Sequence, residues 1–365
     1  FGRLIDLLIG IHLMATINFA ESIDTVQTDL AEIQPTIFPA VPRILEKMHS
    51  SALVKMKDAS YVKRLLFKFS TFLGDIAVER KLNKNFDDFL AKILLSIGYI
   101  LSFRSLRKKL GLQRAEFAAS GAAPIAPEVL KFFMSIGVPL FEAYGMTENC
   151  AYATSNSPEN IKIGTVGVPA HGVELKLAED GEILIRSGGV FKGYFKDEQA
   201  TNETIDKDGW LYTGDVGIFE GDFVKIVDRK RDIIITSGGK NVSPSEIENK
   251  IKVSPFVKEA IVIGDRRKFL SVLIGIEFDT VSNWALRKNI PHTTYRDLSE
   301  KQEVKDLVWK EILKANEKTS SLEVREFRMI PKELDHEEGE LTATQKVKRN
   351  VLIEQFSDLI EEMYS

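Results

Sequence analysis

The sequence predicts an α/β protein: part of a large domain with a parallel sheet, then a β-rich subdomain, then a small α+β domain. The prediction rests on three successive patterns in the 365 residues. Helical and strand-like runs alternate over residues 1–159, short strands and glycine turns fill 160–230, and strands again alternate with helices over 231–365. We expect these ranges to be the domains, with the small C-terminal one mobile.

The first range contains a predicted strand–helix–strand unit. The segment "AEFAASGAAPIAPEVLKFFMSIGVPLFEAYG" is typical of a strand, a glycine turn, a helix from about Pro127 that stops at Gly137, and a second strand. An earlier run predicts a strand over 36–39 and a helix opened by Pro42. Strands joined in this way run parallel. Because such sheets bind ligands at the carboxyl ends of their strands, the loops after Gly121 and Tyr144 should share one crevice.

The second and third ranges differ in their turns and caps. "EDGE" and "EGDF" predict hairpin turns, and so an antiparallel β-rich subdomain over 160–230. "SPSEIENKIKV" predicts a helix with a capping box, in which Ser243 is the N-cap and Glu246 reaches back to it. The last helix should run from Arg349 to about Met363 with an apolar stripe.

Composition excludes some classes of function. The 49 basic and 53 acidic residues give a net charge of −4, so we expect no nucleic-acid partner. A single cysteine, Cys150, excludes an internal disulfide framework; we expect a buried thiol in a reducing, cytoplasmic setting. The chain opens inside an apolar periodic run over 4–20, without an initiator Met, which we interpret as a cut in a longer protein. That run favours a buried helix and strand over a membrane span.

One helical run leaves two interpretations open. "DDFLAKILLSIGYILSFRSLRKKLGLQR" ends in five basic residues between Arg104 and Arg114, with no acidic residue among them. The run could be a helix packed on the sheet with a solvated basic end. Alternatively, its apolar and cationic side chains could make a peripheral contact with a membrane.

Four separated segments carry the chemistry. They are "YGMTE" (144–148), "GWLYTGD" (209–215), "VDRKRDIIITSGGKNVSPSEIE" (227–248) and "GELTATQKVKR" (339–349). Together with "SGAAPIAPEV" and "GTVGVPAHGVELKL", their order and spacing resemble the adenylate-forming superfamily of acyl- and aryl-CoA synthetases, luciferases and peptide-synthetase adenylation domains. Within it, they resemble the long-chain fatty acyl-CoA synthetases over essentially all 365 residues. The superfamily's Ser/Thr/Gly-rich phosphate loop is absent, so we expect a C-terminal fragment without turnover of its own.

The resemblance implies a ligase that uses ATP, Mg²⁺ and CoA. It would activate a medium- to long-chain fatty acid as acyl-AMP and transfer the acyl group to CoA as a thioester. Two alternatives stay open: an acyl-AMP ligase that donates to a carrier protein, and a nucleotide- or acyl-binding remnant that has lost catalysis.

The resemblance also assigns the residues of the nucleotide site. Glu148 would hold Mg²⁺, a hard cation suited to carboxylate oxygen, and Thr147 would donate to the α-phosphate. Asp215 would accept from both ribose hydroxyls, with a turn-forming aspartate as the bland alternative. The remaining residues would line the nucleotide and acyl pocket or contact the ribose or phosphate: Gly121, Ala122, Ala123, Pro124, Tyr144, Gly145 and Arg229.

Three further assignments fall on the C-terminal domain. Lys346 would place an ammonium on the α-phosphate and carboxylate oxygens during adenylation. Its position with Lys348 and Arg349 at a helix start favours anions; a solvated basic helix entry is the alternative. Gly238 and Gly239 would let the pantetheine arm of CoA pass the backbone, unless they form only a hairpin turn. Arg231 stands at the superfamily's hinge position.

Overall fold

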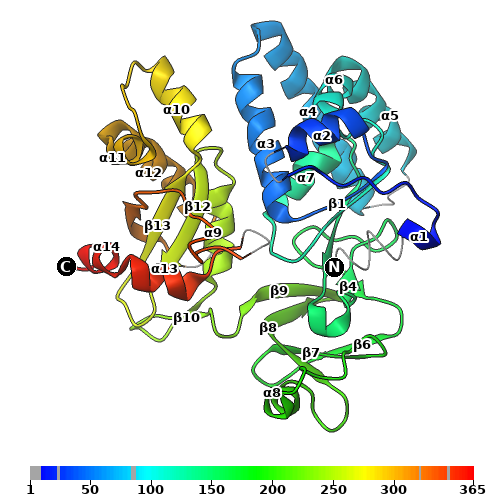
Figure 1. The fold of residues 1–365 in the computed structure, drawn as a ribbon. Helices are drawn as coiled ribbons and strands as arrows, with labels where there is room; N and C mark the ends of the chain where they lie inside the picture. Colours follow the sequence, from blue (N-terminus) through cyan, green and yellow to red (C-terminus); the bar gives the residue numbers. More distant parts are fainter. Residues whose placement is uncertain (1–9, 23–24, 84–87, 320–321, 343–345) are drawn as a thin grey trace. The chain divides into compact units, whose positions relative to one another are not determined.

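The computed structural model describes residues 10–22, 25–83, 88–319, 322–342 and 346–365 (Figure 1). Its contacts divide the chain into two compact units, Phe1–Ile226 and Val227–Ser365, which we call unit 1 and unit 2. The predicted α/β class is confirmed, because both units combine helices with β-sheet.

The first sheet of unit 1 is mixed and has the strand order β1-β2-β3-β4-β5. The pairs β1–β2 and β2–β3 are parallel, and β3–β4 and β4–β5 are antiparallel. The predicted strand–helix–strand unit is confirmed, since α7 (Pro127–Ser135) connects β2 to β3 and Gly137 follows it with φ +83°. The strand bounds are β1 (Ile37–Ala40), β2 (Phe117–Ser120), β3 (Leu140–Tyr144), β4 (Thr154–Ser155) and β5 (Val168–Pro169).

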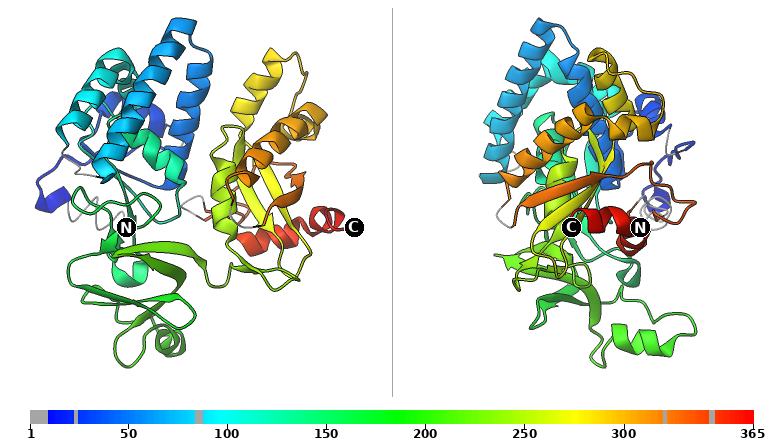
Figure 2. Two further views of the ribbon diagram at one scale, coloured as in Figure 1. Left: turned by 180° about the vertical axis from the view of Figure 1, so that it is seen from behind. Right: turned by 90° about the vertical axis from the view of Figure 1, so that its left-hand side faces the viewer.

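Helices cover this sheet and pack on one another. The inner side of α4 meets α7 at Gly74, where an added Cβ would lie 2.2 Å from the carbonyl oxygen of Ser135. The helices α4 and α5 run side by side (Figures 1 and 2), and Arg80 forms an ion pair of 2.8 Å with Asp88 at the N-cap of α5. The bounds are α1 (Gly10–His12), α2 (Val26–Ile33), α3 (Pro42–Lys57), α4 (Tyr61–Asn83), α5 (Phe89–Gly98), the π-helical segment η2 (Tyr99–Phe103) and α6 (Arg104–Lys109).

Two predictions for the N-terminal part meet different outcomes. The helix predicted to open at Pro42 is confirmed, with Pro42 in its first turn. The buried helix and strand predicted over 4–20 are wrong within the described part: only Gly10–His12 is helical, and most residues over 10–20 are exposed. The beginning of that prediction, residues 4–9, lies outside the described residues. Apolar periodicity alone cannot show whether a covering surface is present.

An antiparallel sheet completes unit 1. The pairs β6–β7 and β7–β8 are antiparallel, and β9 is the neighbour of β8. The turns at Gly181 (φ +83°) and Gly221 (φ +70°) join β6 to β7 and β8 to β9, which confirms both predicted hairpins. The amide N–H of Val166 donates to the carbonyl of Val224 at 2.8 Å, linking the two sheets of the unit. The bounds are β6 (Val173–Leu177), β7 (Glu182–Ser187), α8 (Glu198–Thr204), β8 (Leu211–Glu220) and β9 (Phe223–Arg229).

Unit 2 has a three-stranded sheet with an apolar cluster on each face. The pair β12–β13 is antiparallel, and β13–β14 is parallel. A short hairpin, β10–β11, precedes α9. The bounds are β10 (Ile234–Ile235), β11 (Asn241–Val242), α9 (Pro244–Lys252), β12 (Val257–Ile263), β13 (Leu270–Ile276), α10 (Phe278–Arg287), α11 (Tyr295–Glu300), α12 (Gln302–Asn316), β14 (Val324–Met329), α13 (Arg349–Gln355) and α14 (Ser357–Glu362).

The end of the chain differs from the prediction in one respect. Two short helices, α13 and α14, replace the single helix expected from Arg349 to Met363. The apolar stripe itself holds in part, because Leu352, Phe356 and Ile360 are buried while Ile353 is exposed.

Candidate active site

Two loops of unit 1 meet at the carboxyl ends of β2 and β3. The strands are in register at Ser120 and Glu142. A Cβ added to Gly121 would lie 3.0 Å from the carbonyl oxygen of Ala143, so the loop passes close to the end of β3. Ala122 has a φ of +70°, a left-handed conformation that is uncommon for a residue with a side chain. The predicted pocket residues 121–124 therefore lie at this edge, beside the start of the 144–148 segment.

Tyr144 joins β3 to the antiparallel sheet through Asp215. Its hydroxyl donates to Oδ2 of Asp215 at 2.6 Å, across 71 positions of sequence. Both residues are buried, and the Tyr144 ring packs in the core cluster with Ile183 and Leu211. Asp215 lies inside β8, directly after Gly214 (φ +71°), whose N–H donates to Glu182 at 2.8 Å. Asp215 is therefore held in an irregular strand with one oxygen fixed by a phenol.

Thr147 and Glu148 lie in a single 3₁₀ turn, Thr147–Asn149, directly after β3. The turn is closed by Asn149, whose Oδ1 accepts from the N–H of Met146 at 2.9 Å. Gly145 is required where the chain crosses itself, because a Cβ there would lie 2.3 Å from the carbonyl carbon of Ala151. Thr147 is exposed and Glu148 is half-buried, so both side chains can be reached by a ligand.

A residue that the sequence did not single out, Tyr194, contacts Glu148. The Tyr194 hydroxyl donates to Oε1 of Glu148 at 2.8 Å, and the N–H of Phe191 donates to the Glu148 carbonyl at 2.7 Å. Burial and the Glu148 carboxylate both raise the pKa of Tyr194. The two residues are 46 positions apart, and no local pattern marks Tyr194 as a partner of Glu148. Only the turn that carries Tyr194 back over the 147–149 segment reveals it.

The neighbouring Cys150 is exposed, which makes the prediction of a buried thiol wrong. It follows the 3₁₀ turn in the left-handed conformation (φ +56°). That turn, which closes on Asn149, directs Cys150 outward instead of into the core.

The residues around Glu148 offer few ligands for Mg²⁺. Within the described residues, no group of three or more His, Cys, Asp or Glu side chains gathers to hold a metal ion. Glu148 is thus a single carboxylate, held in place by Tyr194. Mg²⁺ in nucleotide sites keeps waters and binds through one or two carboxylates together with substrate phosphates. The residues fit an ion that arrives with a nucleotide.

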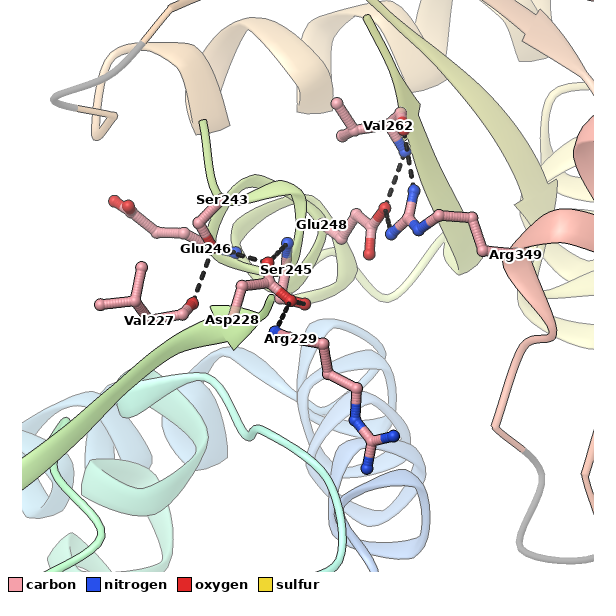
Figure 3. Close-up of polar contacts among 9 residues, drawn as sticks. All are labelled: Val227, Asp228, Arg229, Ser243, Ser245, Glu246, Glu248, Val262 and Arg349. Carbon is pink, nitrogen blue, oxygen red and sulfur yellow. Dashed lines mark hydrogen bonds and ion pairs between the residues drawn. The ribbon is translucent and has the colours of Figure 1, made fainter. Parts of the chain in front are cut away.

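In unit 2, Asp228 closes the start of α9 (Figure 3). Its carboxylate accepts from the N–H of Ser245 at 2.9 Å and contacts the Ser243 hydroxyl at 2.8 Å. Ser243 is the N-cap as predicted, accepting from the N–H of Glu246 at 3.3 Å. The reciprocal half of the predicted capping box is wrong, because the Glu246 side chain pairs with Lys250 at 2.6 Å. The Asp228 carboxylate, from β9, instead accepts from the Ser245 N–H in the first turn of α9.

Arg229 and Arg231 follow Asp228 along the chain. The Arg229 N–H donates to Asp228 at 2.8 Å, and Figure 3 shows its guanidinium extending away from the Asp228 cluster. Arg231, the predicted hinge residue, lies in the turn between β9 and β10 with its side chain 76% exposed. Its Nε is 3.8 Å from the Asp232 carboxylate, too long for a hydrogen bond.

Gly238 and Gly239 lie in the turn of the β10–β11 hairpin. Both are exposed, and Gly239 has a φ of +74° with no atom within 4 Å of an added Cβ. The Gly239 N–H donates to the Thr236 carbonyl at 2.9 Å. The turn requires glycine for its backbone conformation, and its outer surface is open.

Lys346 is exposed in a second turn of unit 2. Its N–H donates to the Thr342 hydroxyl at 3.0 Å, and its carbonyl accepts from the Thr342 N–H at 2.8 Å. The prediction that Arg349 joins Lys346 and Lys348 in favouring anions at the helix start is wrong. That guanidinium turns inward to Glu248 at 2.5 Å and to the Val262 carbonyl at 2.8 Å (Figure 3).

A cavity of about 360 Å³ in unit 2 is separate from these residues. It lies between α12 and β14, where Trp309 and Phe327 stack with ring centroids 5.5 Å apart. No predicted site residue lines it.

Comparisons with known proteins identify the family of the chain. A sequence model of the AMP-binding enzyme family matches residues 1–195, and a model of the AMP-binding enzyme C-terminal domain matches residues 231–365. The long-chain-fatty-acid–CoA ligase FadD15 of Mycobacterium tuberculosis is 33% identical over 97% of this chain and 59% of its own length. The long-chain-fatty-acid–CoA ligase ACSBG2 of Xenopus laevis is 31% identical over 92% of this chain and 48% of its own length.

A solved structure shows the same fold. The adenylation domain of a carboxylate reductase from Mycobacterium chelonae superposes with a TM-score of 0.70 at 21% identity, covering 96% of this chain and 50% of that chain. The chain thus spans about half to three fifths of the length of these proteins. The predicted resemblance to the adenylate-forming enzymes is confirmed: the chain belongs to the AMP-binding enzyme family.

Proposed function

We propose that this chain is the C-terminal part of an ATP-dependent ligase that activates a medium- to long-chain fatty acid as acyl-AMP and transfers it to CoA. The observation that carries the proposal is the pair of contacts Tyr144–Asp215 and Glu148–Tyr194. The first holds Asp215 against Tyr144, the last residue of the parallel strand β3, and the second holds Glu148 in the turn that follows it. The carboxyl ends of parallel strands are where such sheets bind ligands. The names of the sequence relatives support the fatty-acid substrate class.

In the first half-reaction, the fatty-acid carboxylate attacks the α-phosphate of ATP and pyrophosphate leaves. Asp215 accepts from the ribose hydroxyls, and Tyr144 keeps its carboxylate from turning. Thr147 donates to the α-phosphate. Glu148 would hold Mg²⁺, which neutralises phosphate charge when it is bound. Small residues over 121–124 leave room for adenine and the acyl chain. Gly145, packed against Ala151, lets the turn that carries Thr147 and Glu148 close beside them.

Unit 2 serves the remaining steps. Lys346 places an ammonium on the α-phosphate and acyl oxygens, where negative charge develops. The Gly238–Gly239 turn passes the pantetheine arm, and the CoA thiolate then displaces AMP from the acyl carbon. Arg231 is the proposed pivot between these two uses of unit 2. We propose a cytoplasmic site for the reaction.

The test uses the full-length protein with palmitate, ATP, Mg²⁺ and CoA. Pyrophosphate release and palmitoyl-CoA formation are expected, and Asp215→Asn should lower both about 100-fold by removing a charged acceptor of the ribose. Asp222→Asn, an exposed aspartate in the β8–β9 turn, is the matched control. Wild-type turnover by Asp215→Asn would exclude Asp215 as the ribose contact. Residues 1–365 alone should show no turnover.

The acceptor is decided by a second measurement. With CoA as acceptor, preformed palmitoyl-AMP should be consumed only when CoA is added. The chain shares its fold with the adenylation domain of a carboxylate reductase, so an acceptor other than CoA is also tested. If palmitoyl-AMP persisted in CoA, the protein would be an acyl-AMP ligase that donates to a carrier. If no pyrophosphate were released at all, it would be a binding remnant.

A further inference from the structure

The outer side of α5 carries an exposed apolar stripe. Within the described part of the chain, 89–109 is the one helical run long and apolar enough to cross a membrane, yet only 22% of its most apolar 18-residue window is buried. Phe89, Ile93, Ile97 and Ile100 are 77%, 39%, 40% and 79% exposed. Their spacing of four, four and three residues places them on one side of the helix.

The adjacent helix α4 carries a second stripe. Tyr61, Leu65, Phe69 and Phe72 follow the same spacing, and each is at least half exposed. The opposite side of α4 is also apolar and is buried in unit 1. The helices α4 and α5 pack side by side (Figure 2), and each carries one of these exposed apolar stripes. Single exposed apolar residues are ordinary, but a run of eight on two neighbouring helices indicates an interaction surface.

Positive charge accompanies both stripes. The segments 61–74 and 89–115 contain no Asp or Glu. Exposed Arg104 and Lys108 continue the α5 stripe at the next two helical turns, and exposed Lys63, Arg64 and Lys68 lie along α4. Arg107 is not part of this group, because its guanidinium donates to four backbone carbonyls, among them that of Gly137 at 3.0 Å.

We propose that this surface, the eight stripe residues with their flanking cations, docks on an anionic lipid bilayer. Apolar side chains would enter the acyl-chain boundary while Arg104, Lys108 and the α4 cations meet lipid phosphates. A second copy of the chain is the poorer occupant, since a twofold contact would bring two basic rims together.

The helix would lie on the bilayer and not cross it. The apolar part, 89–103, rises about 22 Å at about 1.5 Å per residue, short of the about 30 Å hydrocarbon core. The inner side of this run already packs inside unit 1, since Ala91, Gly98 and Phe103 are buried. Substrate delivery from the bilayer would follow if the proposed function holds, but docking itself does not depend on it.

The test is co-sedimentation of residues 1–365 and of the full-length protein with vesicles of phosphatidylcholine alone or with 30% phosphatidylglycerol. Both proteins should bind the anionic vesicles at least about tenfold more strongly than the neutral ones. Ile93→Ser/Ile97→Ser/Ile100→Ser should lower the partition coefficient at least about tenfold, as should Arg104→Glu/Lys108→Glu. These side chains are exposed, so the variants should keep the wild-type thermal midpoint.

Matched controls come from unit 2. Leu286→Ser/Leu313→Ser removes exposed apolar side chains, and Lys288→Glu/Lys310→Glu makes the same change in net charge. Both should bind as wild type. The proposal is overturned if the stripe variants bind normally, if the controls lose binding equally, or if neutral vesicles bind as well. It is also overturned if only residues 1–365 bind, because a further segment of the protein then covers the surface. A dimer that the stripe variants dissociate, without vesicle binding, would show contact between copies.

Discussion

The site residues of the two units are held in different ways. In unit 1, Tyr144 and Asp215 are buried and joined at 2.6 Å, and Glu148 is joined to Tyr194 at 2.8 Å. In unit 2, Lys346 and the Gly238–Gly239 turn are exposed. The short polar contacts of unit 2 are made by other residues, Asp228 with Ser245 and Glu248 with Arg349.

Whether a site residue is buried or exposed decides what a substitution there should change: stability, catalysis or both. A change to a buried site residue of unit 1, such as Tyr144 or Asp215, alters a packed contact and should affect both the fold and the chemistry. A change to an exposed site residue of unit 2 should affect the chemistry alone, whereas a change to the Glu248–Arg349 pair should affect stability alone.

The largest effect is expected at Lys346. In the full-length protein, Lys346→Ala should lower pyrophosphate release about 100- to 1,000-fold, the cost of one preorganised donor to a developing charge. CoA attack on preformed palmitoyl-AMP should stay within about threefold of wild type. The unfolding free energy should change by less than about 0.5 kcal/mol, as for other exposed positions.

Lys348→Ala is the matched control, because Lys348 is exposed two residues away. It should keep wild-type rates in both half-reactions. Equal losses in both half-reactions for Lys346→Ala would contradict its role in adenylation. A loss of stability would contradict the division between the units.

The same division explains what could be predicted from the sequence. The strand–helix–strand unit and the Ser243 cap depend on local signals, such as Pro127 and Gly137, and both were predicted. The Glu148–Tyr194 contact spans 46 positions and depends on how two turns meet, which no local pattern encodes. Arg349 was misread for a related reason. Three cations at a helix start attract anions, but Glu248, 101 positions away from Arg349, binds one of them.

The next effect concerns stability in unit 2. The Glu248 and Arg349 side chains are 12% and 18% exposed, so removing one partner strands a charge. Arg349→Met should lower the unfolding free energy of unit 2 by about 3 kcal/mol. Urea titration, with amide exchange in β12 assigning the loss to unit 2, measures the change. Glu248→Gln/Arg349→Met should recover part of it.

Arg296→Met provides the comparison, because its pair with Glu300 is solvent-exposed. That change should cost less than about 1 kcal/mol. If Arg349→Met cost equally little, the Glu248–Arg349 ion pair would not be a main source of the stability of unit 2.

A buried carboxyl in unit 1 predicts a pH dependence. Burial raises the pKa of Glu142 to about 8, against the opposing effect of the Ile125 N–H. The folded state then keeps a proton that the unfolded state releases above about pH 4.5. Folding takes up a proton between pH 4.5 and 8, so this contribution to stability is complete below pH 4.5 and is lost as the pH rises.

Glu142→Gln should therefore raise the unfolding free energy of unit 1 at pH 8 by about 2 kcal/mol relative to wild type, and by much less at pH 5. Thermal melts at both pH values, with amide exchange in β3, measure the difference. The same gain at both pH values would show that the proton on Glu142 is not its source.

The smallest effect is expected at Tyr194, and it tests whether the Glu148 contact positions a ligand of Mg²⁺. Tyr194→Phe removes one hydrogen bond to a carboxylate and keeps the ring, so adenylation in the full-length protein should fall about three- to tenfold. Because the carboxylate itself remains, the loss should appear as a higher Mg²⁺ requirement at fixed ATP and should shrink as the Mg²⁺ concentration is raised.

A tyrosine with a purely structural role would give a loss of activity that the Mg²⁺ concentration does not change. Tyr152→Phe, an exposed tyrosine just beyond the same turn, should leave the Mg²⁺ dependence unaltered. If the two variants behaved alike, Glu148 would be held by its 3₁₀ turn alone, and the contrast between a fixed unit 1 site and an exposed unit 2 site would narrow to Tyr144 and Asp215.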